Sequence, residues 1–176
     1  MLGRTSRRPG VSFGILLWLL LAVPGCASGD ENVVASDFET RLVLKNTAGK
    51  ESIEFQSREP ITLAVTIRNR SEAERTLTLP SSQTYDWIIL SGKNKEVWRW
   101  SAGRMFAQVI TELTFAPGES RSFTTTWNLT DGKGAPLPPG DYHVVGLVPG
   151  RAPGLRSGPV AFSVRPPDAT KPPRAN

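Results

Sequence analysis

The sequence predicts an all-β fold, an antiparallel β-sandwich of about eight or nine short strands. Apolar and polar residues alternate in several windows, most clearly over residues 61–69, as in a strand with one buried face. Clusters of Gly, Pro, Asn, Asp and Ser separate these windows, as turns do. No comparable window carries apolar residues at i, i+3, i+4 and i+7, the spacing of an amphipathic helix.

The alternating windows define the expected strands. In chain order these are residues 38–44, 61–69, 75–79, 85–90, 96–100, 109–115, 122–127, 142–148 and 160–164. A Gly-containing loop at residues 91–95 joins the two strands beside it into a hairpin. A short helix at residues 102–107 is the one alternative to this all-strand pattern, and Gly103 disfavours it.

The first 25 residues predict a secretory signal peptide. Arg4, Arg7 and Arg8 give it a basic start, and a mostly apolar run follows over residues 11–23. This run is shorter than the roughly 20 apolar residues that a membrane span needs. We therefore expect the chain to be exported.

Cys26, the only cysteine, follows directly on Val23-Pro24-Gly25. This ending resembles a bacterial lipobox, in which the cysteine becomes the lipidated first residue of the mature protein. The resemblance implies an anchor at the cell membrane or outer membrane, and plain secretion or a periplasmic location is the alternative. The expected parts are a signal peptide (1–25), a lipidated cysteine with a flexible tether (26–36), one domain (37–165) and a disordered Pro-rich tail (166–176).

The charge of the chain does not indicate a nucleic-acid partner. The sequence pI is about 9.8 and the formal net charge +5. Because three arginines leave with the leader and no Asp or Glu precedes Asp30, the mature charge falls to +2 (5 − 3). So small a charge is no electrostatic footprint for nucleic acid. With its only thiol lipidated, the domain has no disulfide and depends on apolar burial for its stability.

The residues also give no sign of an enzyme. His143 is the only histidine, and the chain has no Gly-x-Ser-x-Gly turn. A catalytic triad needs a nucleophile, a base and an acid that converge, and zinc needs more His or Cys ligands than this sequence has. We expect no catalytic residue, metal or cofactor.

Five segments, in order, carry a family resemblance. They are Leu79-Pro80-Ser81-Ser82-Gln83-Thr84-Tyr85-Asp86, Glu96-Val97-Trp98-Arg99-Trp100-Ser101, Gly103-Arg104-Met105-Phe106-Ala107-Gln108, Phe115-Ala116-Pro117-Gly118-Glu119 and Leu137-Pro138-Pro139-Gly140-Asp141-Tyr142. Together they resemble the BsuPI family of bacterial intracellular proteinase inhibitors over roughly residues 61–148. The resemblance implies an Ig-like β-sandwich and, as in the family's namesake, inhibition of a subtilisin-type serine protease.

Two functions follow from this resemblance and the leader. The first is an exported, membrane-anchored proteinase-inhibitor-like domain that acts by non-covalent protein binding. The alternative is a non-catalytic Ig-like module for adhesion or assembly at the cell envelope, which binds a protein or a glycan. Fold similarity alone does not choose between them.

Two aromatic residues of one expected strand are candidates for partner binding. Trp98 and Trp100 are two residues apart, so they share a face. Exposed, they would form an anchor pair for a partner, and buried, they would fill the core. We expect at least one in the core, because a sandwich without disulfides needs large apolar groups. Arg99 then points to the opposite face, where it is solvated or pairs with an acid.

Two loops supply further candidates. They are Ser81, Ser82, Gln83 and Tyr85 around the polar loop at residues 80–84, and Met105 and Phe106 after Gly103. The first loop is typical either of a binding loop or of an ordinary turn in which Ser and Gln bond the local backbone. Met105 and Phe106 form either a loop tucked under the sandwich or an exposed apolar tip.

The last candidate is the connection at residues 149–159, which contains three prolines and three glycines. Inhibitors that mimic a substrate present one stiff loop, because rigidity lowers the entropic cost of binding. Arg151 or Leu155 would then occupy the specificity pocket of a protease. The alternative is an ordinary solvated hairpin loop.

Overall fold

The computed structural model describes residues 35–150 and 154–167. The predicted signal peptide, the predicted lipidation site Cys26, most of the predicted tether, Arg151 and most of the predicted tail lie outside the described residues. Among the residues described, no helix is long and apolar enough to cross a membrane.

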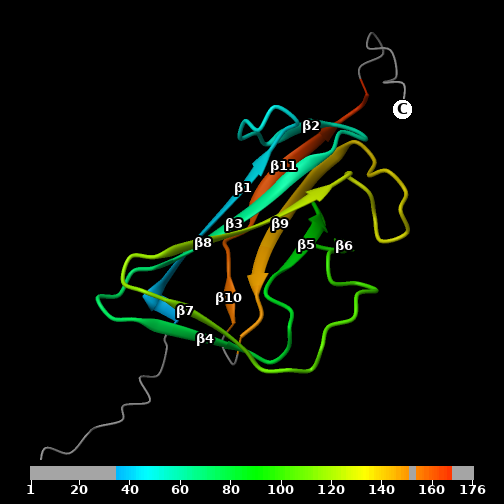
Figure 1. Cartoon of the computed structure of the whole chain (residues 1–176). Helices are drawn as coiled ribbons and strands as arrows, with labels where there is room; N and C mark the ends of the chain where they lie inside the picture. Colours follow the sequence, from blue (N-terminus) through cyan, green and yellow to red (C-terminus); the bar gives the residue numbers. More distant parts are fainter. Residues whose placement is uncertain (1–34, 151–153, 168–176) are drawn as a thin grey trace, which may run out of the picture. The chain divides into compact units, whose positions relative to one another are not determined.

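The described chain consists of strands and one short 3₁₀ helix (Figure 1). The elements are η1 (Ala35–Asp37), β1 (Phe38–Lys45), β2 (Glu54–Gln56), β3 (Ile61–Asn69), β4 (Arg75–Leu79), β5 (Asp86–Ser91), β6 (Glu96–Arg99), β7 (Thr111–Phe115), β8 (Ser120–Trp127), β9 (Gly140–Val148), β10 (Leu155–Arg156) and β11 (Val160–Arg165). All nine predicted strands are present, and the all-β prediction is confirmed.

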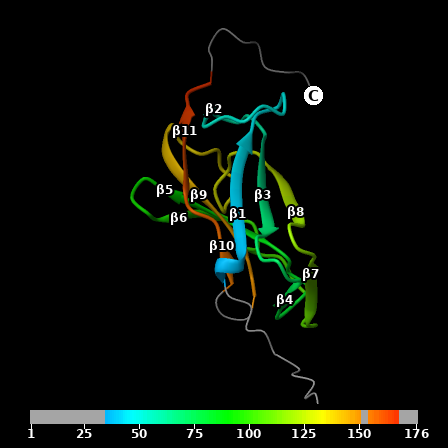
Figure 2. The ribbon, with the colours of Figure 1, turned by 90° about the vertical axis from the view of Figure 1, so that its left-hand side faces the viewer.

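The strands form three sheets. One has the order β1-β3-β8, a larger one has the order β2-β11-β9-β5-β6 with β10 paired to β9, and β4 pairs with β7 alone. In Figure 2, β3 and β8 lie to the right of β9 and β11, so the first two sheets form separate layers. The order of the two main sheets is that of an Ig-type sandwich, in which strands A, B and E face strands C, F and G. The Ig-like prediction is therefore confirmed.

Two details differ from the prediction. The short strands β2 and β10 are additional, and β2 pairs with β11 in parallel, whereas the other strand pairs described are antiparallel. The helix that was the alternative for residues 102–107 is not formed; these residues are a turn followed by an irregular segment. A strand of two or three residues is too short for alternation to reveal it.

The main core lies between the two large sheets. Leu63 and Val65 from β3 share one buried cluster with Trp87 and Ile89 from β5, as their alternating positions predict. Gly146 in β9 makes room for this packing, because a Cβ at that position would lie 3.2 Å from the Trp87 ring and 3.3 Å from Val65. A side chain there would push the sheets apart.

Tyr142 fixes the chain where it enters β9. Its hydroxyl donates a hydrogen bond to the carbonyl of Pro138 at 2.8 Å, the arrangement called a tyrosine corner in Ig-type sandwiches. Burial raises the pKa of the Tyr142 phenol, because removal from water disfavours the phenolate.

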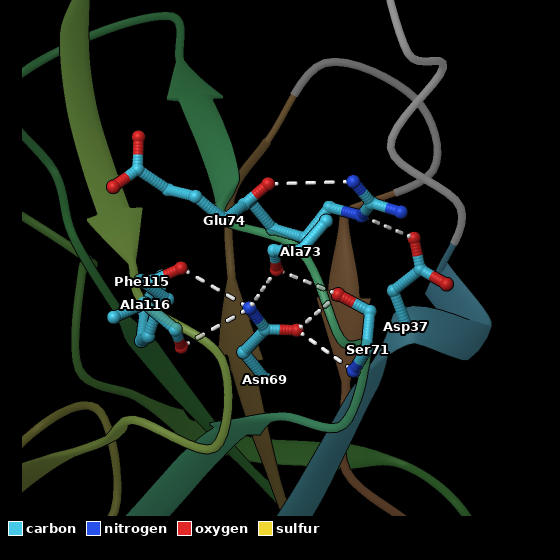
Figure 3. Close-up of polar contacts among 8 residues, drawn as sticks. Asp37, Asn69, Ser71, Ala73, Glu74, Phe115 and Ala116 are labelled. Carbon is cyan, nitrogen blue, oxygen red and sulfur yellow. Dashed lines mark hydrogen bonds and ion pairs between the residues drawn. The ribbon is translucent and has the colours of Figure 1, made fainter.

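A buried polar hub at Asn69 holds the other end of the sandwich together (Figure 3). The side-chain amide of this fully buried residue donates hydrogen bonds to the carbonyls of Ala73, Phe115 and Ala116 at 2.8, 3.1 and 3.1 Å. Its carbonyl oxygen accepts from the amide and hydroxyl of Ser71. One side chain thereby joins the turn after β3 to the end of β7. These bonds satisfy polar groups that would otherwise be costly to bury.

A second buried cluster includes Phe115, whose carbonyl the hub binds. It contains Phe38, Ile67, Leu77, Leu79, Phe115, Val148 and Leu155, contributed by six strands. Leu155 is therefore a core residue: it is only 5% exposed and belongs to β10, which pairs with β9. The prediction that Leu155 stands on an exposed loop and enters a protease pocket is wrong.

Candidate functional site

The segment between β6 and β7 is the most exposed apolar part of the described chain. Of the large hydrophobic residues described, four are exposed, and three belong to this segment: Met105 at 97%, Val109 at 54% and Ile110 at 63%. The segment at residues 104–110 is neither helix nor strand, and in Figure 1 it is part of the long green connection from β6 to β7. Of the two alternatives for Met105, the structure shows the exposed apolar tip.

Asp86 fixes the root of this segment. Its buried carboxylate accepts hydrogen bonds from the backbone amide and the hydroxyl of Ser101 at 3.0 and 2.8 Å. The same carboxylate lies 3.7 Å from Arg99, which therefore pairs with an acid as predicted. The amide of Trp100 donates to the carbonyl of Trp87 at 3.0 Å. The chain consequently leaves β6 in one fixed direction.

Trp100 is the platform on which the segment rests. Its half-buried ring has the Tyr85 ring at 4.4 Å and the Phe106 ring at 5.8 Å. The guanidinium of Arg104 lies 4.3 Å above it, and the Arg104 Nε donates to the Trp100 carbonyl at 2.9 Å. Stacking and cation–π contacts of this kind hold both neighbours of Met105.

The polar loop at residues 80–84 braces the segment from the other side. The amide of Ser82 donates to the carbonyl of Ala107 at 2.9 Å, and the amide of Ala107 donates to the Ser82 hydroxyl at 2.9 Å. Ser81 and Gln83 act within the loop itself: the Ser81 hydroxyl accepts from the Gln83 amide, and the Gln83 side chain donates to the Tyr85 carbonyl. The loop therefore contains the local turn bonds expected of an ordinary turn, and in addition it bonds to Ala107 of another loop.

Most of the predicted contact residues therefore meet in one place. We name this place the braced loop surface; it comprises Ser82, Gln83, Tyr85, Trp100, Arg104, Met105, Phe106 and Ala107, together with Ser81, which is buried. Trp98 is separate from it, because its ring stacks on Trp127 at 5.1 Å and packs against the main core. The two tryptophans pack against the same core cluster, as their spacing predicts.

Four residues were not identified as candidates from the sequence: Arg104 and Ala107 of the braced loop surface, and Asp86 and Ser101 at its root. Asp86 and Ser101 are the last residues of two of the quoted motifs. The motifs therefore contained both residues, but they did not reveal that the two side chains contact each other. A pair separated by fifteen residues leaves no periodic trace in a sequence.

The side chains of the site are of kinds that suit non-covalent contact. Aromatic rings and a thioether dominate the braced loop surface, whose amides at Ser82 and Ala107 already donate hydrogen bonds within the protein. Among the described residues, no three His, Cys, Asp or Glu side chains gather into a group that could hold a metal.

Comparison with known proteins adds a family. Residues 47–153, which include the whole braced loop surface, match the family BsuPI, described as "Intracellular proteinase inhibitor". No curated protein matches the chain.

Solved structures with similar folds are distant in sequence. The C-terminal domain of wzt shares 11% identity with a TM-score of 0.46, over 73% of this chain and 74% of that one. The alkylpurine DNA glycosylase AlkC of Pseudomonas fluorescens shares 16% with a TM-score of 0.45, over 73% of this chain and 30% of that one. Spo0M, the sporulation control protein of Bacillus subtilis, shares 13% with a TM-score of 0.45, over 73% of this chain and 49% of that one.

Proposed function

This chain belongs to the BsuPI family of proteinase inhibitors, and on that premise we propose that it inhibits a subtilisin-type serine protease by non-covalent contact. The family match confirms the resemblance seen in the sequence, and it confirms that the domain is not an enzyme. Membership implies protease binding. The subtilisin type of the target is our proposal, taken from the family's namesake.

The observation that carries the proposal is the pair of hydrogen bonds between Ser82 and Ala107. These bonds join two loops that are far apart in the sequence into one surface before any partner arrives. Association costs less when the contacting backbone is already ordered, so bracing of this kind favours tight binding without chemistry. The braced loop surface is therefore our candidate for the contact with the protease.

The leader supports a proposal about location. We propose that the inhibitor is exported and anchored at the cell membrane or outer membrane through lipid on Cys26. The observations behind this are the basic, apolar leader and the lipobox-like ending at Cys26. A cysteine that carries two or more chains gives firm anchoring, whereas a single chain is marginal.

The anchor is tested by expressing the full chain in a bacterium and comparing it with the variant Cys26→Ser. We expect the wild type in the membrane fraction, with a mass that shows loss of residues 1–25 and addition of lipid. Cys26→Ser should keep neither the lipid nor the membrane association. A wild-type chain that is exported without lipid would overturn the anchor and favour plain secretion.

The inhibition is tested by titrating the purified full chain, held in detergent, against a subtilisin-type serine protease. Stoichiometric loss of protease activity with the chain left intact is the expected result. No inhibition, or steady digestion of the chain as a substrate, would overturn the proposal. In that case the envelope adhesion or assembly module becomes the better reading.

A further inference from the structure

Met105 stands alone at the tip of the braced loop surface. Its side chain is 97% exposed, whereas the residues on either side are held by the protein itself. Arg104 is fixed on the Trp100 ring and carbonyl, and Phe106 stacks beside that ring. The Met105 side chain is therefore exposed to solvent, while its two neighbours hold the backbone that presents it.

The backbone on both sides of Met105 is fixed as well. Before it, Ser101 is bound by Asp86, and the amide of Arg104 donates to the Ser101 carbonyl at 3.1 Å. Gly103 allows this tight turn, since its φ of +74° lies in the left-handed region that side chains disfavour. After it, both backbone polar groups of Ala107 are engaged by Ser82. The protein therefore prepares this short segment in one conformation.

From these contacts, and resting on the proposed inhibitory function, we propose that Met105 is the side chain that enters the specificity pocket of the target protease. The target is accordingly a serine protease whose pocket accepts a large, uncharged, apolar side chain. A protease pocket of this kind is an apolar slot, and a flexible thioether adapts well to such a slot.

Other side chains are less suited to this role. Arg104 and Phe106 would have to give up their contacts with Trp100 in order to reach outward. Ile53, the exposed apolar residue outside this segment, has its carbonyl bonded to the amide of Ser163 in β11, so it lies at a sheet edge away from the braced loops. Val109 and Ile110 are half to two-thirds exposed and would contact the rim of the protease cleft.

The test compares the full-length wild type with three variants in the inhibition titration. Met105→Glu places a charge in an apolar pocket and should raise the inhibition constant about a hundredfold, the effect of losing a central hot spot. Met105→Leu keeps the size and the apolar character and should stay within about threefold of wild type. Ile53→Glu, a matched exposed site, should inhibit as wild type does.

Oxidation gives a second readout on the same atom. Hydrogen peroxide transfers one oxygen atom to the Met105 Sδ, forming the polar sulfoxide and releasing water. The chain has two methionines, and the other is Met1, so Met105→Leu separates them cleanly. We expect peroxide to weaken inhibition by the wild type about tenfold and to leave Met105→Leu unchanged.

The outcomes distinguish the two proposals. If the wild type inhibits and Met105→Glu inhibits equally well, the assignment of Met105 is overturned while the inhibitory function stands. If peroxide weakens Met105→Leu as much as the wild type, the loss does not arise at Met105 and the assignment again fails. If the wild type does not inhibit, both proposals are overturned. Thermal unfolding of Met105→Glu, expected at the wild-type temperature because the site is exposed, confirms that the variant is folded.

Discussion

The Asn69 hub and the braced loop surface use the same device in opposite surroundings. In both, a polar side chain bonds to the backbone of a distant loop. Asn69 is fully buried, whereas Ser82 and Ala107 are exposed. Water can replace a hydrogen bond at the surface but not one in the interior. The Asn69 bonds should therefore contribute mainly to the stability of the domain, and the Ser82–Ala107 bonds mainly to the conformation of the loops. Four variants, from the largest expected effect to the smallest, test this division.

Asn69→Ala should cause the largest loss of stability. It leaves the buried carbonyl of Phe115 and the part-buried carbonyls of Ala73 and Ala116 without this donor, and we expect the free energy of unfolding to fall by about 3 kcal/mol. Urea denaturation measures this loss. Asn46→Ala is the matched control, because Asn46 bonds two amides of an exposed turn, and it should cost less than about 1 kcal/mol. Equal losses in the two variants would contradict the role of burial.

Asp86→Asn should have an intermediate effect that reaches both stability and binding. The amide keeps the shape but cannot reproduce both the acceptor for the Ser101 hydroxyl and the ion pair with Arg99. We expect a stability loss of about 2 kcal/mol together with weaker inhibition. Ser101→Ala, which removes only the hydroxyl, should lose about half as much stability. An unchanged inhibition constant in Asp86→Asn would show that the root of the segment does not control its tip.

Tyr142→Phe should cost less stability than the Asn69 variant and more than the Ser82 variant, because it removes the single hydrogen bond from the Tyr142 hydroxyl to the Pro138 carbonyl. We expect a loss of about 1 kcal/mol near neutral pH. Since burial raises the pKa of Tyr142, the wild type gains stability from the neutral phenol below its ordinary pKa of about 10 and loses it as the pH rises through the folded value. Unfolding curves at pH 8 to 11 should therefore converge for wild type and variant. A constant gap across that range would contradict this linkage.

Ser82→Ala should have the smallest effect on stability, below about 0.5 kcal/mol, because the site is exposed. It removes the acceptor of the Ala107 amide, so the segment loses order and the inhibition constant should rise about tenfold. Ser122→Ala, which breaks an exposed contact with Thr66 elsewhere, is the control and should leave inhibition unchanged. A variant that loses stability and keeps inhibition would reverse the proposed division.

The fold was readable from the sequence because strands repeat every two residues. The bounds of β3 and β4 were predicted to the residue, since alternation and turns agree there. Leu155 was misplaced because its neighbours include glycine, proline and arginine, and it is buried only by pairing of β10 with β9 and by packing in the second cluster. The buried role of Asn69 was not predicted, because an Asn before a turn is common and does not by itself indicate a buried side chain.

The site was predicted in its parts but not in its assembly. Ser82 and Met105 were both named from the sequence, yet the bonds from Ser82 to Ala107 that brace the tip were not. Those bonds join residues 25 apart and follow no period. Sequence patterns report the local backbone and the buried face, whereas contacts between loops are fixed only when the sandwich has closed.

The contacts of Asp37 have a mechanical consequence. Asp37 precedes β1, its carbonyl accepts from the Arg70 amide at 2.7 Å, and its carboxylate pairs with Arg75 at 2.8 Å. Under the proposed anchor at Cys26, drag on a captured protease would be transmitted to the domain at this point. The force would act first on the contacts of Asp37 with Arg70 and Arg75, beside the turn after β3. It would reach the β1–β3 pairing, which begins where Phe38 pairs with Asn69, only afterwards. The turn that Asn69 stabilises is then also the part of the domain that bears force.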